Sequence, residues 1–415
     1  MLRLKFATYF DKVLSAENIF KAAATTAALC ICALHFSPAA ASISLSLFFL
    51  TLFLLARKEC FTTHKVIIFL LAAWILSQLI NQISFGFNSE AKRSLLLRIP
   101  LLLLPLVWFI KPKLSKRPVF IGILFIGLFH AWVGGASVLN YVANYRFLNQ
   151  MVLESKPLPL FSAVYHIEFS LIMAIVILLQ ISFLRYANTG WQRSILIGSM
   201  VVNLLSLHVL SARTGILAFW VGVPFLLGTV TLPMGLKGRN RWWLLTIPLL
   251  LLISVPSLRN RMINTIEDLT AVKDNQNLGD KSFGRRWESW KISVEVIKKQ
   301  PFKGVGWSGV ESAIQREFEH NQTYLHVTDR IHPHNQYLEL AMQSGVISPI
   351  LLIFCFLWMM RVNWRQGNYT AMSVIFALSI SMLFESYLER QSGVAIFVLG
   401  LFYVFFAEKK KEHFQ

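Results

Sequence analysis

Long apolar stretches recur along almost the whole chain and are separated by short polar connections. The clearest are residues 43–56, 101–110, 172–184 and 244–255. A helix needs about 20 mainly apolar residues to cross a bilayer, and it satisfies its own backbone hydrogen bonds there. The pattern therefore predicts an all-α integral membrane protein with about twelve transmembrane helices.

The predicted spans divide the chain into three parts. They lie near residues 19–36, 39–56, 65–83, 94–110, 118–140, 160–184, 193–210, 213–232, 242–256, 345–361, 370–387 and 391–407. Residues 1–256 hold spans one to nine, residues 257–344 form one large and partly helical loop, and residues 345–415 hold spans ten to twelve and a short basic tail. The loop is the longest connection between spans, and we expect it to carry the protein's chemistry.

Two helices are predicted inside this loop. The first has apolar residues on one face at spacings of three and four, and Asp280 or Ser282 can cap its start. The residues of this face are Trp287, Trp290, Val294 and Ile297. The second helix is predicted to begin after His332, because Pro333 suits a first helical turn. Gly345 is expected to mark a break before the next span.

Lysine and arginine gather in short clusters between the apolar stretches, as at Arg57 and Lys58 and at residues 409–411. Such clusters mark the cytoplasmic side of a membrane protein. Despite a formal charge of +19 they interleave no aromatic platform for nucleic acid. With both termini in the cytoplasm, the clusters fall inside and the large loop faces outward. None of the four cysteines lies in the loop, so no disulfide framework is implied.

Arg213 lies in a connection of only a few residues between two predicted spans. The connection is predicted on the outer side of the membrane, where basic residues are under-represented. This arginine either binds an anion or extends its charged end from a helix terminus into water. The sequence leaves both interpretations open.

Arg285 and Arg286 fall in the first turn of the first predicted loop helix. The helix dipole already presents partial positive charge there. Two guanidinium groups are therefore unfavourable unless an anion binds both them and the free backbone amides. Salt bridges to Asp280 or Glu288 are the alternative. Arg286 also shares a face with Trp290, which places it at the rim of an apolar surface.

His334 is predicted to lie in the first turn of the second loop helix. Histidine can exchange a proton near neutral pH, so this side chain can serve as a general base. A structural role and a metal ligand are the alternatives. His320, His326 and His332 share the loop, but no carboxylate or cysteine accompanies them at a recognisable ligand spacing. We therefore expect no metal site.

Two arginine sites and a base on the outer side suit a transfer reaction with an anionic leaving group. Arginine recognises phosphate oxygens in a forked geometry. The chain has no Walker A motif and no dinucleotide-binding glycine motif. A phosphate-activated donor that is reached from outside the cytoplasm is therefore expected to be lipid-linked.

The arginine and histidine motifs described above resemble those of the bacterial O-antigen ligase and O-antigen polymerase superfamily. The matching motifs are Ser-Ala-Arg213-Thr-Gly after a span, Gly-Arg-Arg286 followed by Trp290, and His334-Asn335 followed by Glu339 and Gly345. The layout of about twelve spans, with the large loop between the ninth and the tenth, also agrees. The resemblance covers nearly the full chain.

The resemblance implies a multi-pass enzyme of the bacterial inner membrane with a periplasmic active site. Its donor would be a glycan linked to undecaprenyl pyrophosphate, and the transfer would invert the anomeric carbon without a metal or another cofactor. Arg213 and Arg286 would bind the pyrophosphate, and His334 would activate the acceptor hydroxyl. Further substrate contacts, with ordinary interfacial polar roles as the alternative, are expected from Arg285, Arg261, Asn335, His166, Glu168 and Arg98.

Within this superfamily we prefer the ligase that joins O-antigen to the core oligosaccharide of lipid A. Its partners would be the lipid-linked donor, the lipid A core and membrane lipids, without nucleic acid. An O-antigen or exopolysaccharide repeat-unit polymerase is the alternative, because Ser348 stands where ligases often carry a second glycine after Gly345. A lipid-linked saccharide transporter would be expected to carry ionisable residues near mid-membrane, whereas the span centres here are largely free of charge.

Overall fold

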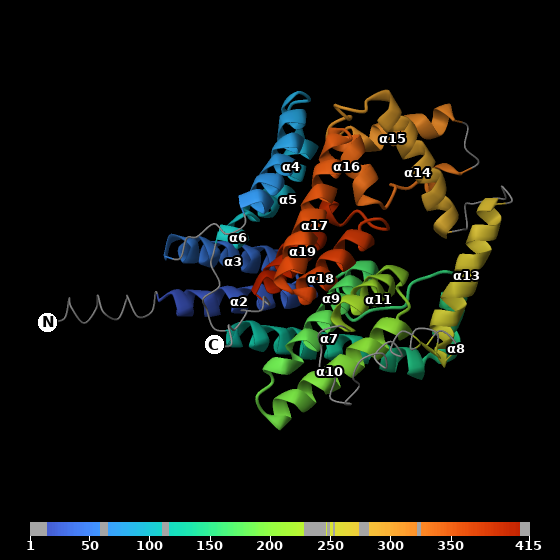
Figure 1. Cartoon of the computed structure of the whole chain (residues 1–415). Helices are drawn as coiled ribbons and strands as arrows, with labels where there is room; N and C mark the ends of the chain where they lie inside the picture. Colours follow the sequence, from blue (N-terminus) through green and yellow to red (C-terminus); the bar gives the residue numbers. More distant parts are fainter. Residues whose placement is uncertain are drawn as a thin grey trace.

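The computed structural model describes residues 15–58, 65–109, 116–227, 254–273, 282–321 and 325–406, together with residues 246, 250 and 251. Across these residues the chain is helical and contains no β-strand. The prediction of an all-α protein is therefore confirmed. Figure 1 shows the helices as one bundle, with a smaller group of helices at its upper right.

Helices cover most of each predicted span that the structure describes, but residues 160–165 of the sixth predicted span and residues 382–387 of the eleventh are not α-helical. These helices are α2 (Ala16–Ala33), α3 (Pro38–Lys58), α4 (Lys65–Ile83), α5 (Ser89–Leu103), α6 (Leu106–Phe109), α7 (Arg117–Ala143), α9 (His166–Phe183), α10 (Gly190–Val209), α11 (Arg213–Leu227), α17 (Ile347–Gln366), α18 (Tyr369–Ser381) and α19 (Gln391–Phe406). Among the described residues, 5 helices are long and apolar enough to cross a membrane. Most of the ninth predicted span, 242–256, lies outside the described residues.

Helix α9 lies at the centre of the bundle. Within it, 94% of the most apolar stretch is buried, against 33% to 50% in the other candidate spans. It packs against α7, α10, α11, α18 and α19. Gly215 lets α11 approach it closely, because a Cβ there would lie 2.4 Å from the hydroxyl oxygen of Ser170 on α9. Small residues allow membrane helices to pack in this way.

The described part of the large loop contains four α-helices, namely α13 (Pro256–Lys273), α14 (Ser282–Lys299), α15 (Val310–His320) and α16 (Gln336–Ser344). In Figure 1, α14, α15 and α16 lie together at the top of the molecule and α13 runs down its right side. They share a small apolar core of their own, which includes Ile292, Val296, Ile314, Phe318 and Met342. The prediction of a partly helical loop is confirmed.

Two details of the predicted loop helices are wrong. In α14, whose first described residue is Ser282, Trp287 and Val294 are exposed, and the buried face carries Ser289, Ile292, Ser293 and Val296 instead. Small serines can pack more closely than tryptophan, and Ser289 donates a hydrogen bond to the carbonyl oxygen of residue 331. The second helix, α16, begins only at Gln336, so Pro333 precedes it rather than lying in its first turn.

The loop helices are tied to the other connections that the charge pattern places on the outer side. Trp307 donates its backbone N–H to Gln82 at the end of α4 (2.8 Å). Asn264 on α13 bonds the carbonyl oxygen of Val152 (3.0 Å). The backbone N–H of Leu388 bonds Gln336 on α16 (2.7 Å). These bonds bring segments far apart in the sequence to one end of the molecule, where a shared site can form.

Candidate active site

A cavity of about 550 Å³ lies where α9, α11, α13 and α14 meet. Its lining is basic, with Lys156, Arg213, Arg261, Arg285 and Arg286. Among the described residues that line it, Glu154 is the one carboxylate, and it is paired with Lys156 at 2.8 Å. A lining of this charge attracts anions.

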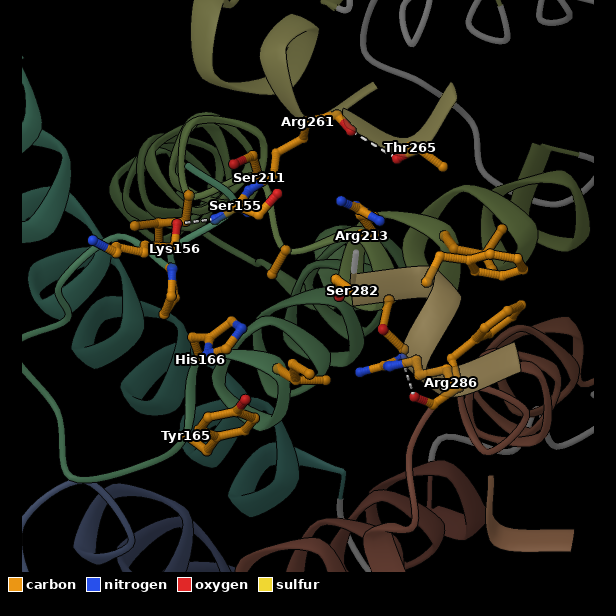
Figure 2. Close-up of a pocket in the computed structure, with 18 of the residues that line it drawn as sticks. Ser155, Lys156, Tyr165, His166, Ser211, Arg213, Arg261, Thr265, Ser282 and Arg286 are labelled. Atoms are coloured by element: carbon orange, nitrogen blue, oxygen red, sulfur yellow. Dashed lines mark hydrogen bonds between the residues drawn. The ribbon is translucent and has the colours of Figure 1, made fainter. Parts of the chain in front are cut away.

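The arginines of the cavity come from three different helices, as Figure 2 shows for Arg213, Arg261 and Arg286. Arg213 is the first residue of α11, and Arg285 and Arg286 lie near the start of α14. His166, the first residue of α9, borders the same space. Helix N-termini carry partial positive charge and free backbone N–H groups, so they reinforce the attraction for an anion.

Like charges are held close together in this cavity. Burial, together with the charge of Arg213, lowers the pKa of Arg261 to about 10. Arg261 donates a hydrogen bond to the carbonyl oxygen of Lys156, yet neither Arg213 nor Arg261 forms an ion pair with any described carboxylate. A bound anion would relieve this repulsion, because it would bring negative charge to two guanidinium groups that form no ion pair with a described carboxylate.

Arg286 is fixed at the edge of the cavity by contacts to the segment that follows α18. Its Nη1 donates to the carbonyl oxygen of Phe384 (2.7 Å), and its Nη2 lies 3.7 Å from Oε2 of Glu385. The alternative of a salt bridge to Glu288 is wrong, because Glu288 pairs with Lys291 at 2.7 Å. The other partner considered, residue 280, lies outside the described residues. Among the described residues, the carboxylate paired with Arg286 is therefore that of Glu385, from a distant part of the chain.

Arg285 points to a different partner from Arg286. Its guanidinium lies 3.6 Å from the carboxylate of Asp329, in the segment before α16, and it also borders the cavity. This pair is about one third exposed on each side, so it binds only weakly in water.

His334 forms a pair with Glu385. Its Nδ1 lies 2.9 Å from Oε1 of this carboxylate, whose side chain is 1% exposed. Burial alone would raise the pKa of Glu385, but the hydrogen bond and charge of His334, with the charges of Arg286 and Arg390, lower it below its ordinary value. A carboxylate that accepts the Nδ1 proton leaves Nε2 free to take up a proton.

The position of His334 is set by the backbone before α16 rather than by a helical turn. Its φ of +45° lies in the left-handed region, where a residue other than glycine is strained. Trp290 holds the preceding residue, because its Nε1 donates to the carbonyl oxygen of Pro333 (2.6 Å). His334 does not line the cavity itself, but Glu385 connects it to Arg286 at the cavity's edge.

The remaining sequence candidates fall into different places. Asn335 caps α16, because its side-chain oxygen accepts from the backbone N–H groups of Tyr337 and Leu338. Arg98 is buried away from the cavity and bonds Gln343 and Glu389. Of the secondary candidates, only Arg285, Arg261 and His166 are brought to the cavity.

Metal ligands do not gather in the part of the chain that the structure describes, where no group of three or more His, Cys, Asp and Glu side chains could hold an ion. His332 instead bridges two loop helices, with its Nε2 2.5 Å from Glu311 and its Nδ1 3.5 Å from Glu339.

Glu385 was not among the residues singled out from the sequence, although this residue pairs with His334. Its signal was a carboxylate inside the predicted span 370–387, where charges are rare and often functional.

Residues 169–353 match the family model of the O-antigen ligases. The matched region includes Arg213, Arg286 and His334 and ends before Glu385. The match confirms the resemblance to the O-antigen ligase and O-antigen polymerase superfamily. No curated protein matches the chain.

Proposed function

We propose that the protein is a membrane ligase that transfers a polyprenyl-pyrophosphate-linked O-antigen to the core oligosaccharide of lipid A. Its family supports an O-antigen ligase or polymerase activity, carried out by a glycosyltransferase-like membrane enzyme. One observation carries the finer proposal. A cavity lined by Arg213, Arg261 and Arg286 adjoins the paired side chains of His334 and Glu385.

The arginine cavity suits the pyrophosphate of the donor. The charge of Asp268 acts on Arg213, but neither Arg213 nor Arg261 forms an ion pair with a described carboxylate. Both can therefore neutralise the charge that grows on the leaving phosphate oxygen. Arg286, held by the carbonyl oxygen of Phe384, adds a guanidinium of fixed orientation. Charges held in place in this way stabilise a transition state without rearranging during the reaction.

The paired His334 and Glu385 suit the acceptor. In the proposed reaction, Nε2 of His334 takes the proton of an acceptor hydroxyl while Glu385 holds Nδ1 and stabilises the imidazolium. The hydroxyl oxygen bonds to the anomeric carbon as the bond to the pyrophosphate oxygen breaks. Attack from the face opposite the pyrophosphate inverts the anomeric carbon. Polyprenyl pyrophosphate leaves with the electron pair of the broken bond, and the proton of the acceptor hydroxyl remains on His334.

The proposed setting is the bacterial inner membrane, crossed by about twelve helices with both termini in the cytoplasm. The cavity would then open to the periplasm, where the donor's glycan is displayed. Hydrogen bonds that join the loop helices to the ends of α4 and α8 (Tyr145–Leu153) support this, because these ends are assigned to the same side by the lysine and arginine clusters.

A repeat-unit polymerase is the alternative within the superfamily, since it also needs a pyrophosphate site and a base. We prefer the ligase on the overall layout, although Ser348 replaces a frequent ligase glycine and is wholly buried in α17. A transporter of lipid-linked saccharide is less well supported, because the arginines and the histidine meet at helix ends.

Deletion of the gene tests the proposal, with the cell's glycolipids separated on a gel. For a ligase, long polymerised chains persist on the lipid carrier while the lipid A core stays bare. A single repeat unit on the core, with the long chains lost, would identify a polymerase. Complementation with the intact gene is the control.

A further inference from the structure

A second and larger hollow lies on the apolar surface of the protein. This groove, of about 1000 Å³, runs between α3 and α5 with α6 and α19 beside it. Its walls are mainly apolar, and several of their side chains are exposed. They include Leu50 (53% exposed), Phe53 (51%) and Leu96 (66%). Exposed side chains of this kind on membrane-spanning helices suit contact with hydrocarbon chains.

One end of the groove is polar and basic. Arg93 at the start of α5 and Arg390 before α19 both line it, together with Glu389. Glu389 is paired with the buried Arg98 at 2.9 Å, so its charge is already balanced. Arg93 makes no ion pair with a described carboxylate. The groove therefore combines an apolar trough with a cationic end, which is the pattern of an anionic lipid.

Arg390 places this end of the groove beside the paired His334 and Glu385. Its guanidinium lies 3.9 Å from Oε1 of Glu385, the oxygen that His334 also contacts. It further lies 3.6 Å from Glu168 and 5.0 Å from the ring centre of Tyr165. Tyr165 borders the arginine cavity. Glu385 therefore lies between the two hollows. Arg390, which lines the groove, is on one side of it, and Arg286, which lines the cavity, is on the other.

We propose that this groove holds the phosphorylated lipid anchor of the acceptor, with its chains along α3 and α5 and its phosphate at Arg93 and Arg390. The inference rests on the proposed function and names the place of its second substrate. The arginine cavity already supplies the larger set of cations for the donor's pyrophosphate. An acceptor must instead bring a hydroxyl to His334, and a lipid in the groove would display its saccharide beside Glu385.

The test uses the full-length enzyme in phosphatidylcholine vesicles that contain either lipid A or undecaprenyl pyrophosphate as the probe. A photo-crosslinking amino acid replaces Leu97, which lines the groove, or Leu47, which is exposed on α3 outside it. We expect position 97 to capture lipid A, and position 47 to capture neither probe above the level of bulk lipid. Capture of undecaprenyl pyrophosphate at position 97, or equal capture at both positions, overturns the proposal.

Kinetics on the same vesicles give an independent measure. Arg93→Gln removes a charge-assisted contact, so it should raise KM for the acceptor roughly tenfold with little change in kcat or in KM for the donor. Ser46→Trp, which places a large side chain in the groove, should also raise KM for the acceptor. The matched controls are Lys92→Gln, an exposed cation beside Arg93, and Leu47→Trp. Unchanged acceptor KM in both groove variants overturns the proposal.

Failure of this inference and failure of the proposed function give different results. If the wild type transfers glycan while the groove captures no lipid A, the function stands and the acceptor binds elsewhere. If the wild type transfers nothing to lipid A although the groove captures it, the ligase proposal fails.

Discussion

The imidazole Nδ1 of His334 lies 2.9 Å from a carboxylate oxygen of Glu385, although 51 positions separate the two residues in the sequence. His334 precedes α16, whereas Glu385 follows α18, so only the packing of the loop on the bundle brings them together. The bond determines which imidazole nitrogen is free to act as a base. It also gives Arg286 a neighbouring negative charge, at 3.7 Å.

Substitution of Glu385 should impair the chemical step rather than binding. Glu385→Gln removes the negative charge that orients and stabilises the imidazolium, so we expect kcat to fall by roughly tenfold or more, with KM for the donor little changed. Steady-state kinetics in vesicles measure both constants. Glu319→Gln, an exposed carboxylate on α15, is the control. A kcat equal to that of the wild type would remove Glu385 from the mechanism.

Loss of either principal arginine should nearly abolish transfer. Arg213→Ala or Arg286→Ala removes a charge placed for the leaving group, and we expect a loss on the order of a hundredfold or more. Arg286→Lys should also be poor, because a lysine cannot both bond Phe384 and face the cavity with a second donor. Arg316→Ala, an exposed arginine on α15, should behave as the wild type. Full activity of Arg286→Lys would contradict the forked contact.

Chelation should leave the reaction unchanged. The arginines supply the positive charge that a metal ion would otherwise bring to a pyrophosphate. Transfer is therefore expected to proceed at the same rate after dialysis against EDTA. Inhibition by EDTA that zinc reverses would instead point to a histidine-based metal site in the loop.

Labelling in intact cells with a permeabilised outer barrier should establish which side the cavity faces. In a cysteine-free background, Ser312→Cys on α15 should react with a membrane-impermeant thiol reagent, because the loop is proposed to be periplasmic. Asn188→Cys, between α9 and α10, should react only after the inner membrane is opened. Both positions are exposed, so they differ only in the side of the membrane. The reverse pattern would overturn the proposed function.

The bridge formed by His332 should make the stability of the loop depend on pH. The hydrogen bond to Glu339 raises the pKa of His332 to about 9 from 6.5, against the opposing effect of burial, and the charges of Glu339 and Glu311 add to it. A raised pKa means that the stabilising contribution is complete below about pH 6.5 and is lost as the pH rises through about 9.

Thermal unfolding of the purified protein in detergent measures this dependence. We expect the Tm of the wild type to fall across that pH window, and His332→Gln to show a smaller fall from a lower starting value. His320→Gln, at the exposed end of α15, should keep the wild-type slope. Identical slopes in His332→Gln and the wild type would mean that the bridge contributes nothing.

The sequence alone was enough to predict that the chain is helical. It also singled out Arg213 and Arg286, which the structure brings to one cavity, and His334, which lies beside that cavity without lining it. Helix formation in an apolar stretch depends on residues close in the chain, because each backbone hydrogen bond closes within the segment. The motif around Arg213 likewise consists of neighbouring residues. Helices and short motifs can therefore be predicted from the sequence.

Tertiary structure decided which residues meet. The pairing of His334 with Glu385, and the groove end at Arg390, depend on how the loop helices pack on the bundle. Helix α14 buries the face that carries its small serines rather than the face with Trp287, because the fit to neighbouring segments determines which face is covered. His334 likewise lies before α16, since Asn335 caps that helix and Gln336 is its first residue. These outcomes depend on which packing of distant segments has the lowest free energy. A pattern of neighbouring residues in the sequence does not contain that information.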